Sequence, residues 1–124
     1  MSKDKPLVLV VDDDVPIQIL MQSLLREFGF TTLTAGSGEA ALNVVKEGAR
    51  PDLVLLDIHM PGMSAADAIR ALREEDGLDA VPVMILSGER LSPQEVAAMG
   101  ANGAIQKPFD IAELVTTIRE QVGA

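Results

Sequence analysis

The sequence contains no cysteine, tryptophan or tyrosine, and phenylalanine occurs only three times. Without cysteine there is no disulfide bond, thiolate metal site or thiol nucleophile, and this composition fits a reducing compartment. The scarcity of aromatic rings argues against stacking on single-stranded nucleic acid or on a flavin. Because 48% of the residues are hydrophobic, the chain still has ample material for an aliphatic core.

Positive charge is also scarce, with 10 Lys and Arg residues against 19 Asp and Glu residues and a formal net charge of -9. Neutralising the phosphates of a nucleic acid needs clustered basic residues, so we expect no nucleic-acid partner. The N-terminus, Met1 to Pro6, is short and polar, and no apolar run approaches the roughly 18 residues of a membrane span. We therefore expect no membrane partner and a cytoplasmic location.

The length of 124 residues suits one domain, spanning 1–124 with a core over about 7–122. Apolar runs alternate with apolar residues at helical spacing throughout the chain. The runs predict strands at 7–11, 31–34, 53–56, 81–86 and 104–106, and the helical patterns fall at 17–28, 39–46, 64–72, 92–100 and 110–122. Strict alternation of this kind predicts an α/β fold with a parallel sheet, right-handed crossovers and helices on both faces.

Short polar motifs mark where several helices begin. Ser92 and Glu95 enclose Pro93 in the pattern of a capping box, and Ser64 with Asp67 and Asp110 with Glu113 have the same spacing. Asp14 is expected to cap the first helix. Pro61 and Gly62 stand in the order that a type II turn favours.

Chemically active side chains follow four of the predicted strands. In an open parallel sheet, ligands bind beyond the carboxyl ends of the strands, near the point where the strand order reverses. The residues found at those ends are Asp12, Asp13, Asp57, Ser87 and Lys107. Three carboxylates, a hydroxyl group and an ammonium group are therefore expected to converge at one edge of the sheet.

These groups suit phosphoryl transfer. Carboxylates held this close repel one another unless a cation is present, and Mg²⁺ binds oxygen ligands and phosphoryl groups together. Lys107 is a point charge suited to a phosphoryl or carboxylate oxygen, and Ser87 can donate a hydrogen bond to the same group. With no evident His, Cys or Lys nucleophile, the carboxylate of Asp57 is the candidate phosphoryl acceptor. His59 is a weaker candidate, because Mg²⁺ prefers oxygen ligands.

Four short motifs carry these residues, at 10–14 (VVDDD), 55–62 (LLDIHMPG), 85–88 (ILSG) and 107–109 (KPF). In this order and spacing, the sequence resembles the receiver domain of two-component response regulators from Leu7 to about Val122. The resemblance implies a flavodoxin-like, doubly wound fold with a five-stranded parallel sheet in the order 2-1-3-4-5. It also implies a module of phosphorelay signalling, whose phosphorylation switches partner binding.

The same resemblance assigns roles to the site residues. Asp57 would accept the phosphoryl group from a sensor histidine kinase or a phosphotransfer protein. Mg²⁺, or Mn²⁺, would be bound directly by Asp13, Asp57 and the backbone carbonyl of His59, with Asp12 acting through water. Ser87 resembles the switch residue of the family and Lys107 its phosphate-contacting lysine, and the Lys107–Pro108 bond resembles a peptide that is often cis in this family.

The chain departs from the family at Ala104, three residues before the lysine, where receivers commonly have Tyr or Phe. The aromatic part of the switch is therefore lost, and we expect the signal to travel through the backbone of residues 87–92 and the helix that follows. The expected output surface comprises that helix, the strand at 104–106 and the last helix, and it would bind an unidentified downstream protein.

The sequence favours a signalling module over a metabolic enzyme, one that assists its own phosphorylation and slow autodephosphorylation. His59 and Glu89 would then influence the access of water. One alternative is a pseudo-receiver scaffold that works without phosphorylation, favoured by Ala104 and opposed by the acid pocket and Lys107. A less favoured alternative is a Mg²⁺-dependent phosphohydrolase with an Asp nucleophile, for which the chain is too short to supply a substrate cap.

Overall fold

A computed structural model describes residues 5–123 of the chain, so most of the polar segment Met1 to Pro6 lies outside the described residues. The strands are β1 (Leu7–Val11), β2 (Thr31–Ala35), β3 (Leu53–Asp57), β4 (Val83–Ser87) and β5 (Gly103–Gln106). The helices are α1 (Val15–Glu27), α2 (Gly38–Lys46), α3 (Ala65–Arg73), α4 (Pro93–Ala98) and α5 (Ile111–Val122). Strands and helices alternate along the whole described chain, as the sequence predicts.

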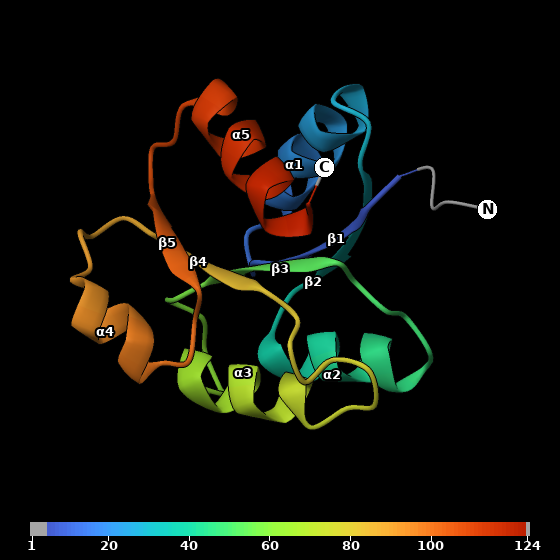
Figure 1. The fold of residues 1–124 in the computed structure, drawn as a ribbon, viewed down its shortest axis with the longest axis vertical. Helices are drawn as coiled ribbons and strands as arrows, with labels where there is room; N and C mark the ends of the chain where they lie inside the picture. Colours follow the sequence, from blue (N-terminus) through green and yellow to red (C-terminus); the bar gives the residue numbers. More distant parts are fainter. Residues whose placement is uncertain (1–4, 124) are drawn as a thin grey trace.

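The five strands form one parallel sheet in the order β2-β1-β3-β4-β5, which confirms the predicted fold class. Helices α1 and α5 cover one face, α2 and α3 cover the other, and α4 lies beside β5 at the edge of the sheet (Figure 1). Among the described residues, no helix is both long enough and apolar enough to cross a lipid bilayer.

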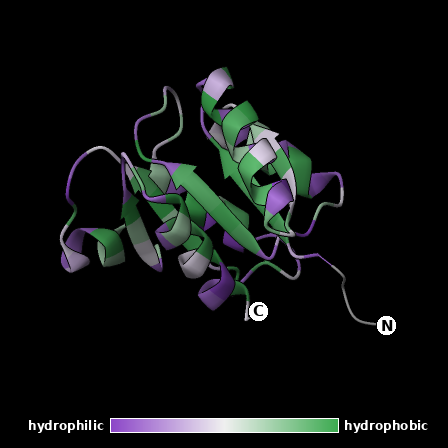
Figure 2. Cartoon of the chain, turned by 90° about the horizontal axis from the view of Figure 1, so that it is seen from above, coloured by the Kyte–Doolittle hydropathy of each residue, from purple (hydrophilic) through white to green (hydrophobic). Residues whose placement is uncertain are grey.

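The core lies on both faces of the sheet. Leu53 and Leu55 of β3 pack in the cluster under α1 and α5, while Val54 and Leu56 pack in the cluster under α2 and α3. All four side chains are fully buried. Successive side chains of a strand point to opposite faces, so a strand covered on both sides needs apolar residues at every position. Figure 2 shows the strands of the sheet coloured largely as hydrophobic.

Three strands end one residue later than the sequence predicts, at Ala35, Asp57 and Ser87, and two strands start at a different residue. Strand β4 begins at Val83 rather than at residue 81, because the Val81 N–H donates to Leu78 O at 3.2 Å and belongs to the preceding turn. Val81 is nevertheless buried, which is why its sequence resembles the start of a strand. Strand β5 begins one residue early, at Gly103, which pairs in register with Met84.

The helix caps follow the sequence closely. Ser92 accepts from Glu95 N at 3.1 Å, and the Glu95 carboxylate accepts from Ser92 N at 2.8 Å, so α4 has a complete capping box. Ser64 accepts from Asp67 N at 3.1 Å, but the Asp67 carboxylate lies 3.2 Å from Arg70. The predicted Ser64 cap is therefore present, whereas its acidic partner pairs along its own helix.

Gly38, the first residue of α2, lies close to α3 and to the loop before it. A Cβ atom at this position would lie 3.2 Å from the Ala68 Cβ and 3.2 Å from the Met63 sulfur. We expect Gly38→Ala to destabilise the protein by about 1–2 kcal/mol through overpacking, although alanine is the better helix former. Gly36→Ala, where the nearest atom is a Gln18 side-chain nitrogen at 3.8 Å, is the matched control. Urea denaturation that shows Gly38→Ala as stable as the control would contradict this expectation.

Candidate functional site: an acidic pocket at the carboxyl edge of the sheet

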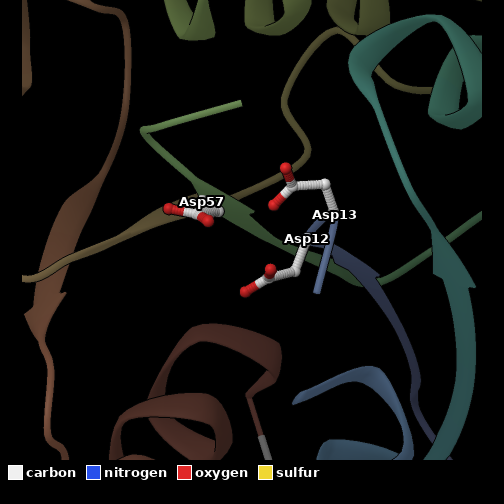
Figure 3. A group of neighbouring side chains, drawn as sticks. All are labelled: Asp12, Asp13 and Asp57. Carbon is white, nitrogen blue, oxygen red and sulfur yellow. The ribbon is translucent and has the colours of Figure 1, made fainter. Parts of the chain in front are cut away.

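Asp12, Asp13 and Asp57 meet where the strand order reverses. Asp12 and Asp13 directly follow β1, and Asp57 is the last residue of β3, the neighbour of β1 in the sheet. One carboxylate oxygen from each residue lies within 4.8 Å of the others. Figure 3 shows the three carboxylates directed into the same space. The structure thus brings together the acidic residues that the sequence places at the strand ends.

Lys107 joins two of these carboxylates from the far end of the chain. Its Nζ lies 3.3 Å from Asp12 Oδ2 and 3.6 Å from Asp57 Oδ2. The Lys107 N–H donates to Ser87 O at 2.7 Å, which fixes the start of this loop to the end of β4. The Lys107–Pro108 peptide bond is cis. Lys107 is therefore a direct electrostatic partner of both Asp12 and Asp57.

Backbone N–H groups orient the two buried carboxylates. Asp12 Oδ1 accepts from Asp14 N at 2.9 Å, and Asp57 Oδ1 accepts from His59 N at 3.1 Å. In each case the amide lies two residues after the aspartate, and the second oxygen, Oδ2, is the one that faces Lys107. Both side chains are thus held with one oxygen turned to a backbone amide and the other turned to the lysine.

The pocket carries an excess of negative charge. Asp12 and Asp57 are 1% and 8% exposed, whereas Asp13 is exposed to solvent. Burying two carboxylates beside a single ammonium leaves charge that a cation would neutralise. All the candidate ligand atoms are oxygens, the donor type that Mg²⁺ and Mn²⁺ accept.

The spacing of the oxygens also fits such an ion. Ligands on opposite sides of Mg²⁺ are about 4.2 Å apart, twice the usual metal–oxygen distance. A spread of up to 4.8 Å is therefore compatible with binding after a small closure, or with one carboxylate acting through water.

Ser87 ends β4 beside the acidic residues and is only 1% exposed. Its Oγ accepts a hydrogen bond from Glu89 N at 3.0 Å. This bond ties the hydroxyl to the loop that leads to α4, so any rotation of the Ser87 side chain would change the support of that loop.

The side chains of His59 and Glu89 lie close together, a contact that the sequence did not reveal. His59 Nε2 lies 3.7 Å from Glu89 Oε1, and the two side chains are 68% and 72% exposed. They join the loop after β3 to the loop after β4. Both residues therefore lie on the solvent side of the pocket, with the His59 ring directed to Glu89.

Gln18 is a further residue near the pocket, and sequence reasoning overlooked it. Its side-chain nitrogen donates to Asp12 O at 2.6 Å and so holds the turn between β1 and α1. The signal available in the sequence was a polar residue one helical turn after the Asp14 cap, beside the apolar residues of α1.

Ala104 is exposed and pairs in register with Ile85, on the face of the sheet nearest α4. It borders a hollow of about 350 Å³ between β5 and α4. The lining contains no aromatic residue; it consists of Leu91, Pro93, Val96, Ala97, Ala101, Asn102, Gly103 and Ala104. The predicted absence of an aromatic switch residue therefore corresponds to open space beside α4.

The fold defines a class: doubly wound domains, in which ligands bind at the topological switch point of a parallel sheet, and the acidic pocket lies at that point. The profile of the response regulator receiver domain matches residues 8–119. The chain belongs to this family.

Individual relatives agree with this assignment. The DNA-binding response regulator MtrA of Mycobacterium tuberculosis is 40% identical over 117 residues, which cover 93% of this chain and 50% of that protein. The sporulation initiation phosphotransferase F of Bacillus subtilis is 35% identical over 113 residues, covering 91% of this chain and 90% of the relative. The chain thus spans about half the length of the first group of relatives and nearly the whole of the second.

Solved structures show the same fold. The chemotaxis protein CheY4 of Vibrio cholerae superimposes with a TM-score of 0.85 at 32% identity, over 94% of this chain and 98% of that chain. The receiver domain of a sensor histidine kinase of Pseudomonas aeruginosa gives a TM-score of 0.85 at 25% identity, over 97% of this chain and 99% of that chain. The latter structure is described as having a magnesium ion coordinated in its active-site cleft.

Proposed function

We propose that this chain is a phosphorylation-dependent switch, in which Asp57 accepts a phosphoryl group in a Mg²⁺-dependent reaction. The observation that carries the proposal is the position of Lys107, within 3.6 Å of both Asp12 and Asp57 at the mouth of an oxygen-lined pocket. An ammonium group and a divalent cation on either side of Asp57 would neutralise an incoming phosphoryl group.

The covalent step requires no proton from the acceptor. A carboxylate oxygen of Asp57 attacks the phosphorus atom, a P–O bond forms, and the bond between phosphorus and the donor atom breaks. The donor, a phosphohistidine of a sensor kinase or of a phosphotransfer protein, leaves with the electrons of the P–N bond. Lys107 and the Ser87 hydroxyl supply charge and a hydrogen bond to the transferred oxygens.

Asp13, Asp57 and the His59 carbonyl would hold Mg²⁺ or Mn²⁺ directly, and Asp12 would hold it through water. The ion would supply charge neutralisation to the phosphoryl oxygens. The similar Pseudomonas aeruginosa receiver with magnesium in its cleft supports this assignment. Asp12 is the most buried of the three carboxylates and is already engaged with Lys107, which fits its indirect role.

An apolar surface beside the pocket suits a protein donor. A hollow of about 450 Å³ is lined by Ile17, Leu20, Lys107, Pro108, Phe109 and Ile111. Leu20 of α1 is 47% exposed. Because Lys107 belongs to both the hollow and the acidic pocket, a donor packed against α1 would present its phosphoryl group to Asp57. The relative from Bacillus subtilis is named as a phosphotransferase, which supports phosphoryl transfer at this pocket.

This surface makes a specific prediction for Leu20, which lines the hollow. We expect Leu20→Glu to slow phosphorylation by a protein donor at least about tenfold, because it places a charge in an apolar contact. Phosphorylation by a small phosphodonor should stay unchanged. Leu33→Glu is the matched control, since Leu33 is also exposed (36%) but lies on β2 in register with Leu9, on the face of the sheet that packs under α2 and α3. Equal slowing with both kinds of donor would show that Leu20 acts on the pocket and not on docking.

The conformational change that follows phosphorylation would begin at Ser87. When the Ser87 hydroxyl turns to a phosphoryl oxygen, its bond with Glu89 N weakens and the loop before α4 loses one of its supports. The output surface of α4, β5 and α5 would then change its affinity for a downstream protein. His59 and Glu89, at the solvent side of the pocket, would limit the water that hydrolyses the acyl phosphate.

Intact-mass measurement tests the proposal. Wild-type protein incubated with a small phosphodonor and Mg²⁺ should gain the mass of one phosphoryl group, and chelation of the metal should abolish the gain. No gain from a small donor or from any histidine kinase would favour the pseudo-receiver scaffold. Rapid repeated turnover of an external phosphoester would favour the phosphohydrolase.

A further inference from the structure

Helix α4 is loosely seated against the rest of the protein. It has six residues, Pro93–Ala98, of which only Val96 is buried. A hollow of about 430 Å³ separates it in part from α3, and one of about 350 Å³ lies between it and β5. Figure 1 shows α4 at the outer edge of the sheet, beyond β5. There is therefore space on two sides into which this helix can move.

The C-terminal end of α4 is fixed by a set of hydrogen bonds centred on Arg73. The guanidinium group, at the end of α3, donates to Val81 O at 3.1 Å, to Asn102 Oδ1 at 2.8 Å and to Gly100 O. Asn102 Oδ1 also accepts from Val83 N at 2.9 Å, and Asn102 N donates to Val83 O at 2.8 Å. The turn after α4 is thus tied to α3 and to the start of β4.

The N-terminal end of α4 is attached differently. Its capping box joins Ser92 only to Glu95 of the same helix. In the preceding loop, Glu89 bonds to Ser87 Oγ through its N–H and pairs with His59 through its side chain. Both partners of Glu89 belong to the acidic pocket. One end of α4 therefore depends on the site, while the other depends on Arg73 and Asn102.

We propose that Arg73 and Asn102 form an anchor about which α4 pivots, so that a change at Ser87 displaces the N-terminal end of the helix and leaves its C-terminal end in place. Arg73 and Asn102 are positioning residues, because neither contacts the acidic pocket. The anchor turns a local change of hydrogen bonding into a directed tilt of α4 against β5. This inference rests on the proposed phosphorylation of Asp57, since it describes how that signal leaves the site.

Amide exchange of the full chain, measured residue by residue by NMR, tests the anchor. Wild-type protein is compared with and without beryllofluoride and Mg²⁺, which together mimic a phosphoryl group. We expect changed exchange over residues 88–96 and unchanged exchange over 99–103. In Arg73→Ala, exchange over 99–103 should be roughly tenfold faster, and the response to beryllofluoride should spread into 99–103.

Three further variants test whether misfolding or a non-specific effect could account for the Arg73→Ala result. Asn102→Ala removes the second half of the anchor and should repeat the Arg73→Ala result. Asn102→Asp keeps an oxygen that accepts from both Arg73 and Val83 N, so it should behave as wild type. Arg70→Ala is the matched control on α3, because Arg70 is exposed and pairs only with Asp67 among the described residues.

The outcomes separate this inference from the proposed function. If residues 99–103 of the wild type respond as strongly as residues 88–96, or if the response in both alanine variants stays confined to 88–96, the anchor is wrong and phosphorylation of Asp57 still stands. If beryllofluoride changes nothing in the wild type, including residues 12–14 and 57–59, both proposals are overturned.

Discussion

Asp57→Asn is expected to reduce phosphorylation by a small phosphodonor to an undetectable level, a loss of at least about a thousandfold. The amide has nearly the same shape as the carboxylate but offers no nucleophilic oxygen of comparable strength. The substitution should preserve the fold, because the remaining carbonyl oxygen can still accept the hydrogen bond from His59 N that Asp57 Oδ1 accepts at 3.1 Å. Intact mass after incubation with donor and Mg²⁺ measures the loss.

This substitution also decides between the possible acceptors in the pocket. Asp13 is more exposed than Asp57, and the His59 ring lies at the solvent side of the site. If Asp57→Asn kept a Mg²⁺-dependent mass gain, one of these groups would be the acceptor and the assignment of Asp57 would be wrong. Asp67→Asn serves as the control, since Asp67 is an exposed acid on α3 with Arg70 as its partner.

Much of the fold could be predicted from the sequence because the sheet is buried on both faces. The runs Leu7–Val11 and Leu53–Leu56 have no polar position, a pattern typical of a strand that is covered on both faces. The strand ends are then marked by the first charged residues, Asp12 and Asp57. The strand order itself came from the resemblance to receiver domains, and the structure has the same order.

The convergence of the site residues was predictable for a topological reason. Asp12, Asp57 and Lys107 are far apart in the chain, but each lies at the carboxyl end of a parallel strand, and all such ends share one edge of the sheet. Topology explains why these side chains are close together, whereas their chemical roles depend on the kind of group that each residue carries.

The parts that escaped prediction depend on contacts between a side chain and a distant backbone group. Arg73 reaches the carbonyl of Gly100 and the side chain of Asn102, which are 27 and 29 residues away. In the sequence, Arg73 looks like an ordinary basic residue at the end of a helix, where its positive charge would interact favourably with the helix dipole. Val81 was misassigned for a related reason, since burial in a turn and burial in a strand give the same apolar signal.

Replacing Lys107 with methionine is expected to change metal binding and phosphorylation in opposite directions. The Lys107 ammonium lies 3.3 Å from Asp12 and 3.6 Å from Asp57, so it competes with any cation for the same carboxylates. Its removal should tighten Mg²⁺ binding about tenfold. In free energy, a tenfold change is a modest fraction of the interaction energy of two unit charges, which is roughly 4 kcal/mol at 4 Å in a medium of effective dielectric constant 20. Phosphorylation by a small donor should slow about a hundredfold, because one of the charges that stabilise the transferred oxygens is lost.

The substitution is informative because Mg²⁺ affinity and phosphorylation rate are expected to change in opposite directions. If Lys107 were needed only for folding, its loss would lower both the Mg²⁺ affinity and the phosphorylation rate. Calorimetry or amide NMR can follow the Mg²⁺ titration, since the absence of tryptophan and tyrosine removes the usual fluorescence signals. Lys46→Met is the matched control: it removes the same charge, but Lys46 is the last residue of α2 and its ammonium group pairs with Glu75, just after α3, at 2.9 Å. Weaker Mg²⁺ binding in Lys107→Met, with the fold intact, would show that the ammonium helps to shape the cation site and does not compete for it.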